Sequence, residues 1–255
     1  MRWKQNPSMV LVALLAVTGA VPLAVHAQAP DASASVDADA TPSDADLAAT
    51  NCAIGEERFL PGDYYYCLGT QTYGQQRYGN AKKFFATAAS WASKPAQYVL
   101  GIMALNGDHQ PVNRPLALAW LALASERPNS DFKSAYDSAY HSATAVERQA
   151  AEQLLTQMRP VYADATAAVR AERRYAQGMA MLSRMNNIGG SMYCMEGVST
   201  LAQQTSNPST CRPVQAVVQA VDRTAVNVFD GWSGHVSVGP LQEAAVPQST
   251  SHGGN

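Results

Sequence analysis

The chain has 255 residues and contains 18 Lys and Arg against 20 Asp and Glu, which gives a formal net charge of −2. This near balance offers no electrostatic attraction to nucleic acid or to an anionic membrane surface, so the sequence predicts neither as a partner.

The first 27 residues have the pattern of a secretory signal peptide. Arg2 and Lys4 precede an apolar run over residues 9–21, and the segment ends in Val25-His26-Ala27, with small residues at the positions before cleavage. The run is short for a membrane-spanning helix, so we predict cleavage after Ala27, with an uncleaved membrane anchor as the alternative. Cleavage leaves 16 Lys and Arg against 20 Asp and Glu. We expect a periplasmic or secreted protein with no membrane span.

Two polar stretches flank the part of the chain that we expect to fold. Residues 28–50 are rich in Ala, Asp, Ser and Thr and contain neither a basic nor an aromatic residue. Such a segment buries too little apolar surface to offset the entropy lost on ordering, so we predict a disordered linker there and a disordered tail over residues 244–255. The predicted organisation is a signal peptide (1–27), a linker (28–50), a helical-repeat domain (51–188), a disulfide-containing C-terminal segment (189–243) and the tail (244–255).

The four cysteines all follow the predicted cleavage point, at positions 52, 67, 194 and 211. An even number of cysteines in an oxidising compartment predicts two disulfides. Three connectivities are possible, and we favour the local pairs Cys52–Cys67 and Cys194–Cys211 because each brackets one segment at an edge of the helical region. The sequence has no C-x-x-C spacing, so we expect no metal ion and no redox centre at these cysteines.

Tyr64, Tyr65 and Tyr66 are consecutive and precede Cys67. Three adjacent aromatic side chains cannot all point inward, so we expect at least one to be exposed. Exposed tyrosines are common in protein interfaces, which makes these three the candidate partner-binding residues. Packing under the disulfide loop is the alternative.

Small and large residues recur at fixed spacings between residues 68 and 124. Leu68-Gly69 recurs as Leu100-Gly101 at an offset of 32, and a second block recurs at an offset of 36. The difference falls in the loop between two predicted helices, as in stacked helix pairs. Small residues let two helices approach, a large residue fills the remaining space, and a glycine ends a helix with a left-handed residue. The residues with these predicted packing roles are Leu68, Gly69, Ala81, Phe85, Ala88, Leu100, Gly101, Gly107, Ala117, Trp120, Leu121 and Ala124.

These residues carry a resemblance to helical-repeat families. The first unit, with Leu68-Gly69 and the pattern of Ala81, Phe85 and Ala88, resembles the tetratricopeptide repeat, and the second, LGIMALNG…NRPLALAWLALA, resembles the Sel-one-like repeat. The resemblance covers residues 67–127. It implies an all-α, short helical-repeat solenoid with two clear helix pairs and a degenerate third, whose concave face binds a protein or peptide.

Two residues depart from the family pattern. Asn113 stands where Asp is usual, and Leu123 stands where Ala is usual. The cysteines also do not fall at repeating helical positions, as they do in the cysteine-rich members of the family.

Helix signals support this organisation. A helix begins near Asn80 and is stopped by Pro95, and Asn113 has the residue type of an N-cap, followed by a proline tolerated in the first turn.

Further along, Thr144 and Glu147 match a capping box. It opens a helix over residues 145–158, which Pro160 closes, and a longer helix follows over residues 162–185.

The last part of the predicted fold changes its pattern. Valines at helical spacing over residues 214–221 predict a helix. Beyond Arg223 the apolar residues alternate, at 225–229 and again at 236–238, which indicates a short hairpin.

Patterns of catalytic or metal-binding residues are weak. The histidines at 109, 141, 235 and 252 lack a carboxylate at a metal-ligand spacing, and we interpret them as solvated. Ser130 and Lys133 match S-x-x-K without the further elements of serine enzymes that use this pair. We therefore expect no cofactor and no enzymatic activity. The predicted function is a scaffold of the cell envelope that binds an unknown protein or peptide, and the alternatives are a cell-wall-directed hydrolase or accessory factor and a self-assembling structural protein.

Overall fold

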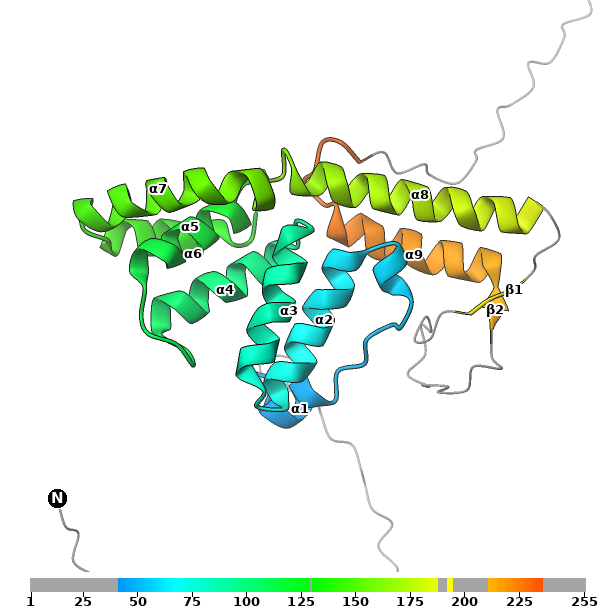
Figure 1. Cartoon of the computed structure of the whole chain (residues 1–255), viewed down its shortest axis with the longest axis horizontal. Helices are drawn as coiled ribbons and strands as arrows, with labels where there is room; N and C mark the ends of the chain where they lie inside the picture. Colours follow the sequence, from blue (N-terminus) through cyan, green and yellow to red (C-terminus); the bar gives the residue numbers. More distant parts are fainter. Residues whose placement is uncertain (1–40, 129, 188–191, 195–210, 236–255) are drawn as a thin grey trace, which may run out of the picture. The chain divides into compact units, whose positions relative to one another are not determined.

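The computed structural model describes residues 41–128, 130–187, 192–194 and 211–235 (Figure 1). The predicted signal peptide and tail lie outside these residues. Helices dominate the described part, so the prediction of an all-α fold is confirmed. In chain order the elements are α1 (Asp44–Ala48), the 3-10 helix η1 (Glu56–Arg58), α2 (Pro61–Gly74), α3 (Tyr78–Ser90), α4 (Lys94–Asn106), α5 (Arg114–Ala124), α6 (Lys133–Ser142), α7 (Ala145–Tyr162), α8 (Ala167–Asn187), the strands β1 (Met192–Tyr193) and β2 (Arg212–Pro213), and α9 (Val214–Val228).

Helix α1 corrects the prediction that residues 28–50 are disordered throughout. The Ser43 hydroxyl accepts a hydrogen bond from the Asp46 amide, and the Asp46 carboxylate accepts one from the Ser43 amide. This capping box satisfies two amides at the helix start. A side chain at Gly74 would lie 2.3 Å from the Ala48 nitrogen, so α1 packs directly on the backbone of α2.

Helix α2 packs on α3, and α4 packs on α5 (Figure 1). A Cβ atom added at Gly69 would lie 2.5 Å from Cδ1 of Phe85, and one added at Gly101 would lie 2.8 Å from Cγ of Leu121. These residues correspond under the offsets of 32 and 36. A glycine of the first helix therefore faces a large side chain of the second in both pairs, which gives a helical-repeat-like arrangement.

Helix ends follow the predicted caps in the second and third pairs. Gly107 ends α4 in the left-handed region at φ 73°, and its amide donates to the Met103 carbonyl. The Asn113 side chain accepts from the Leu116 amide at 3.0 Å. Thr144 and Glu147 form the predicted capping box of α7.

Two prolines do not end helices as predicted. Pro160 lies inside the last turn of α7, which continues to Tyr162, and α8 begins at 167 rather than 162. The chain leaves the helix only where Ala163 becomes extended. Pro95 lies in the first turn of α4, where the missing amide removes no helical hydrogen bond, and α3 has already ended at Ser90.

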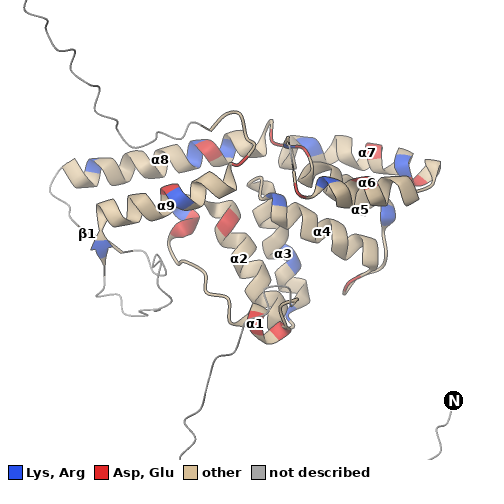
Figure 2. Cartoon of the chain, turned by 180° about the vertical axis from the view of Figure 1, so that it is seen from behind, with Lys and Arg blue, Asp and Glu red and all other residues tan. Residues whose placement is uncertain are grey.

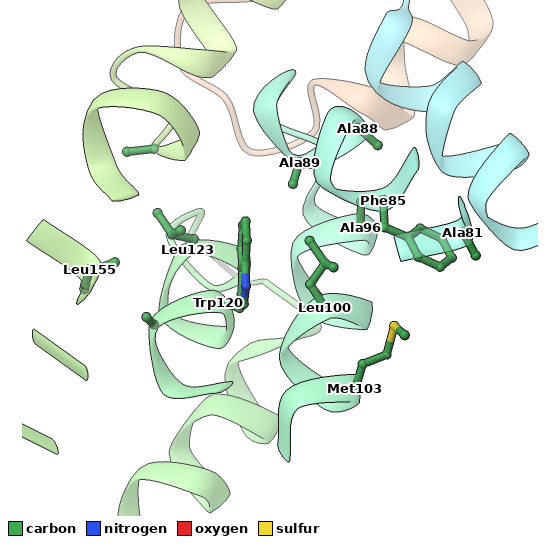
Figure 3. Close-up of a cluster of buried hydrophobic side chains, with 12 residues drawn as sticks. Ala81, Phe85, Ala88, Ala89, Ala96, Leu100, Met103, Trp120, Leu123 and Leu155 are labelled. Carbon is green, nitrogen blue, oxygen red and sulfur yellow. The ribbon is translucent and has the colours of Figure 1, made fainter. Parts of the chain in front are cut away.

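The first hydrophobic core, which we call the stack core, lies among α2–α5 and α7. In Figure 3 the ring of Trp120 lies between Leu100 of α4 and Leu155 of α7. Trp120 is only 8% exposed and makes an edge contact with Tyr162 at 4.7 Å between ring centroids. Helices α6 and α7, which form the degenerate third unit, both pack on α5.

A second hydrophobic core, which we call the closing core, joins segments that are far apart in the sequence. Phe59 is fully buried, and a Cβ atom at Gly178 of α8 would lie 2.4 Å from its ring. The apolar face of α9 completes this core with the buried residues Val214, Val217, Val221 and Ala225. Residues on both sides of the boundary predicted at 188 therefore share one core.

The hairpin prediction is wrong over residues 225–229. Helix α9 continues through Ala225 to Val228. The reason is that Val217, Val221 and Ala225 lie four residues apart and face the closing core, so the helical period prevails over the local alternation. Residues 236–238 lie outside the described part.

The two disulfides join the predicted local pairs. Cys52 is bonded to Cys67 of α2, and Cys194 is bonded to Cys211 beside the antiparallel strands β1 and β2. Loops of 15 and 17 residues are each expected to stabilise the fold by about 3 kcal/mol in the chain-entropy account.

Among the described helices, none is long and apolar enough to cross a membrane.

Candidate functional site

The three candidate tyrosines are all half-buried, so none is fully exposed as we expected. Tyr66 points to the stack core and lies 5.9 Å from Phe85 between ring centroids. Tyr65 stacks on Phe84 of α3 at 6.2 Å, and Tyr64 makes an edge contact with Tyr65 at 5.4 Å. Tyr66 therefore has a packing role.

The half-exposed rings of Tyr64, Tyr65 and Phe84 form what we call the aromatic surface. These three rings are contributed by α2 and α3, and each contacts the next. Aromatic side chains held in a fixed stack lose little conformational entropy on binding and offer a large contact area. Phe84 was not among the predicted binding residues, because its position in the repeat indicates a core role.

A cavity of about 290 Å³ lies beside the first turn of α2. Its walls come from the start of α2, the start of α4, the α5–α6 connection and the end of α9. Asp63 lines the cavity, and the next residue, Tyr64, belongs to the aromatic surface. The cavity and the aromatic surface thus share one turn of α2.

Lys94 lines this cavity and is buried in a network of charges. Its ammonium lies 2.9 Å from the Glu126 carboxylate and 3.0 Å from that of Asp164, and it donates to the Leu123 carbonyl at 2.7 Å. Lys94 is 5% exposed. It donates hydrogen bonds to Gln97 Oε1, the Leu123 carbonyl and the Glu126 carboxylate, and the ion pairs with Glu126 and Asp164 compensate its positive charge.

Arg127 extends the network to α9. Its guanidinium contacts Asp164 at 3.0 Å and donates to the carbonyls of Val228 and Asp230 at 2.7 and 3.0 Å. Removing one member of such a buried pair leaves an uncompensated charge, at a typical cost of about 3–5 kcal/mol. The network therefore fixes α4, the end of α5, the α7–α8 connection and the end of α9 relative to one another around the cavity.

Two polar side chains that line the cavity lack protein partners. Ser93 is 7% exposed, and its hydroxyl makes no hydrogen bond within the described part of the chain. Among the described residues the Asp63 carboxylate likewise has neither an ion pair nor a hydrogen bond, and burial raises its pKa above the ordinary value of 3.8. Both groups are available to a bound molecule.

Glu56 lies at the start of η1, close to Asp63. Burial, together with repulsion from Asp63 and Glu57, raises the pKa of its carboxyl from 4.5 to about 8. Loss of solvation disfavours the charged form of a carboxyl group. Two partly desolvated carboxyl groups are therefore found here, Glu56 before α2 and Asp63 in its first turn.

The described histidines lie in two kinds of surroundings, exposed or paired with a carboxylate. His141 is exposed, and His109 is exposed while it stacks on Tyr78, so both are solvated as predicted. His235 is not solvated, because its Nδ1 lies 2.9 Å from the Glu172 carboxylate and its ring stacks on Phe229. His252 lies outside the described residues.

The S-x-x-K pair does not form a nucleophile–base contact. The Ser130 hydroxyl donates to the Ala124 carbonyl and accepts from the Phe132 amide, and the Lys133 ammonium contacts Asp137 at 2.8 Å. In the described residues no three His, Cys, Asp or Glu side chains are grouped so as to hold a metal ion.

Figure 2 shows both signs of charge on α7 and on α8 rather than a run of one sign.

The charged network around Lys94 was not predicted from the sequence. An antiparallel helix pair places the start of its first helix beside the end of its second, so the predicted pair offered a signal for Lys94 and Glu126. Asp164 carries no such signal, since it lies in a connection between two later helices. The Glu172–His235 contact also joins distant segments and has no local pattern.

Comparison of the chain with models of known families, with curated proteins and with solved structures finds no match in any of the three.

Proposed function

We propose that the chain is a non-catalytic scaffold, periplasmic or secreted, that binds a partner protein through the aromatic surface. The observation that carries this proposal is the stack of Tyr64, Tyr65 and Phe84, which stays half-exposed while Phe85, the next residue of α3, is buried. Two disulfides are consistent with an oxidising compartment. The resemblance of residues 67–127 to Sel-one-like and tetratricopeptide repeats supports a binding role.

Site-specific photo-crosslinking tests this function. A benzophenone amino acid at position 64 is expected to capture one dominant protein in the native envelope or secreted fraction. The matched control carries the same amino acid at Val146 of α7, which is 76% exposed and distant from the aromatic surface in the sequence. Replacing Phe84 by Ser should abolish the adduct at position 64.

Other outcomes favour the alternative functions. An adduct that contains only a second copy of the chain would favour self-assembly. An adduct with wall fragments would favour a hydrolase or accessory factor. Equal capture at positions 64 and 146 would contradict a specific partner surface.

A further inference from the structure

Around the 290 Å³ cavity, the positively charged side chains have ion-pair partners and the negatively charged ones, within the described residues, do not. Both of its cations, Lys94 and Arg127, are engaged by Glu126, Asp164 and backbone carbonyls. Its carboxylates have no such partners: in the part of the chain that the structure describes, the side chains of Asp63, Asp131 and Asp230 form no ion pair. The uncompensated charge that faces the cavity is therefore negative.

A hydroxyl of a largely buried residue also lines the cavity. Ser93 is more than nine-tenths buried, lines the cavity and has no hydrogen-bond partner among the described residues. The Ser93 oxygen and the Asp63 carboxylate can both accept hydrogen bonds, so an N–H donor bound in the cavity could reach both acceptors. This favours a ligand with several donors and a positive charge.

One wall of the cavity is aromatic. Phe132 lines it, and its ring stacks on Tyr98 with 4.8 Å between centroids and an interplanar angle of 26°. A planar cation stacks well on such a face, and a guanidinium also binds a carboxylate through two parallel N–H groups. A compact ammonium matches the aromatic wall less well.

We propose that this cavity binds the guanidinium of an arginine side chain that the partner protein presents, with Asp63 and Ser93 as acceptors and Phe132 as the stacking face. The inference rests on the proposed function, since it names the chemistry by which the partner is recognised. The cavity is near the lower end of the range of about 300–1,000 Å³ for small-molecule sites. Such a volume suits a single side chain.

Backbone amide NMR titrations with capped tripeptides test the proposal. The probes are Ac-Gly-Arg-Gly-NH2 and its counterparts with Lys, Gln or Glu in the centre. We expect the Arg peptide to shift the amides of Asp63, Ser93 and Asn227 saturably, the Lys peptide to bind more weakly, and the Gln and Glu peptides to leave these amides unchanged.

Three variants define the site. Asp63→Asn should weaken binding of the Arg peptide at least tenfold, and Phe132→Leu should weaken it while retaining the preference for a cation. Asp137→Asn is the matched control, because this carboxylate lies on α6 outside the cavity and pairs with Lys133; it should leave binding unchanged. An unaltered amide spectrum of each free variant shows that the fold is intact.

Several results would overturn the proposal. These are the absence of saturable shifts at the cavity with the Arg peptide, equal or tighter binding of the Glu peptide, and undiminished binding to Asp63→Asn. The outcome is separable from that of the proposed function. Capture at position 64 that survives Asp63→Asn would refute the arginine pocket and leave the scaffold function standing. Binding of the Arg peptide without any captured partner would support the arginine pocket and refute the scaffold function.

Discussion

In the helix pairs α2–α3 and α4–α5, a glycine of one helix faces a large side chain of the next helix, at Gly69 with Phe85 and at Gly101 with Leu121. The closing core contains the same kind of contact between residues that are farther apart in the sequence, because Gly178 of α8 faces Phe59, which precedes α2. In the two helix pairs the contacting residues belong to consecutive helices, whereas in the closing core they belong to segments far apart in the sequence. The same contact, a glycine against a large side chain, therefore joins the helices of each repeat-like pair and also joins α8 to the segment before α2.

The largest expected effects come from removing one large side chain in each core. Trp120→Ala in the stack core and Phe59→Ala in the closing core should each lower the free energy of unfolding by about 3–5 kcal/mol, the usual range for a buried aromatic residue. Urea unfolding measures this change. Native-state hydrogen exchange should show faster exchange in α4 and α5 for the first variant and in α8 and α9 for the second.

The distinction between the two cores depends on that regional pattern. Uniform acceleration of exchange across all helices in both variants would mean that the cores unfold as one unit. A loss below about 1 kcal/mol for Trp120→Ala would contradict its burial between α4, α5 and α7.

An intermediate effect is expected from filling the glycine contact of the first pair. Gly69→Ala forces the ring of Phe85 to move and should cost about 1–3 kcal/mol. Gly79 of α3 is the matched control, because a Cβ atom there meets no other atom within 4 Å. Gly79→Ala should instead stabilise the protein by about 0.5–1 kcal/mol, since alanine favours the helix. Equal effects in thermal unfolding would argue against close approach at Gly69.

The last expected effect depends on pH, vanishes at acidic pH and originates beside the closing core. The pKa of Glu56 is about 8 in the folded protein and 4.5 ordinarily. Between these values the folded state retains a proton that the unfolded chain has released, so stability falls as the pH rises from about 4.5 to 8. Glu56→Gln removes the charge. It should raise the free energy of unfolding at pH 8.5, where the wild-type carboxyl must ionise in the folded state, and change it little at pH 4.5.

A control variant isolates this pH dependence. Glu152→Gln on the exposed face of α7 should change stability by less than about 0.5 kcal/mol at both pH values. Identical pH profiles of wild type and Glu56→Gln, measured by urea unfolding, would show that Glu56 is solvated in the folded state.

The sequence alone determined the features that depend on neighbouring residues. The helix caps at Asn113 and Thr144, the left-handed Gly107 and the glycine spacing of the two helix pairs all follow from local patterns, because each involves residues within one helix, one turn or one repeat. The local disulfide pairing was one of three connectivities that the sequence allowed, and the structure selected it.

The tertiary structure decided the rest. The closing core, the charged network and the cavity join Phe59, Lys94, Asp164 and the end of α9, which have no common period. The helical course of residues 225–228 was likewise set by burial against α8. Long-range burial and charge compensation arise only when segments far apart in the sequence come into contact. Apart from the Lys94–Glu126 pair within one helix pair, the spacing of residues along the chain therefore does not predict these contacts.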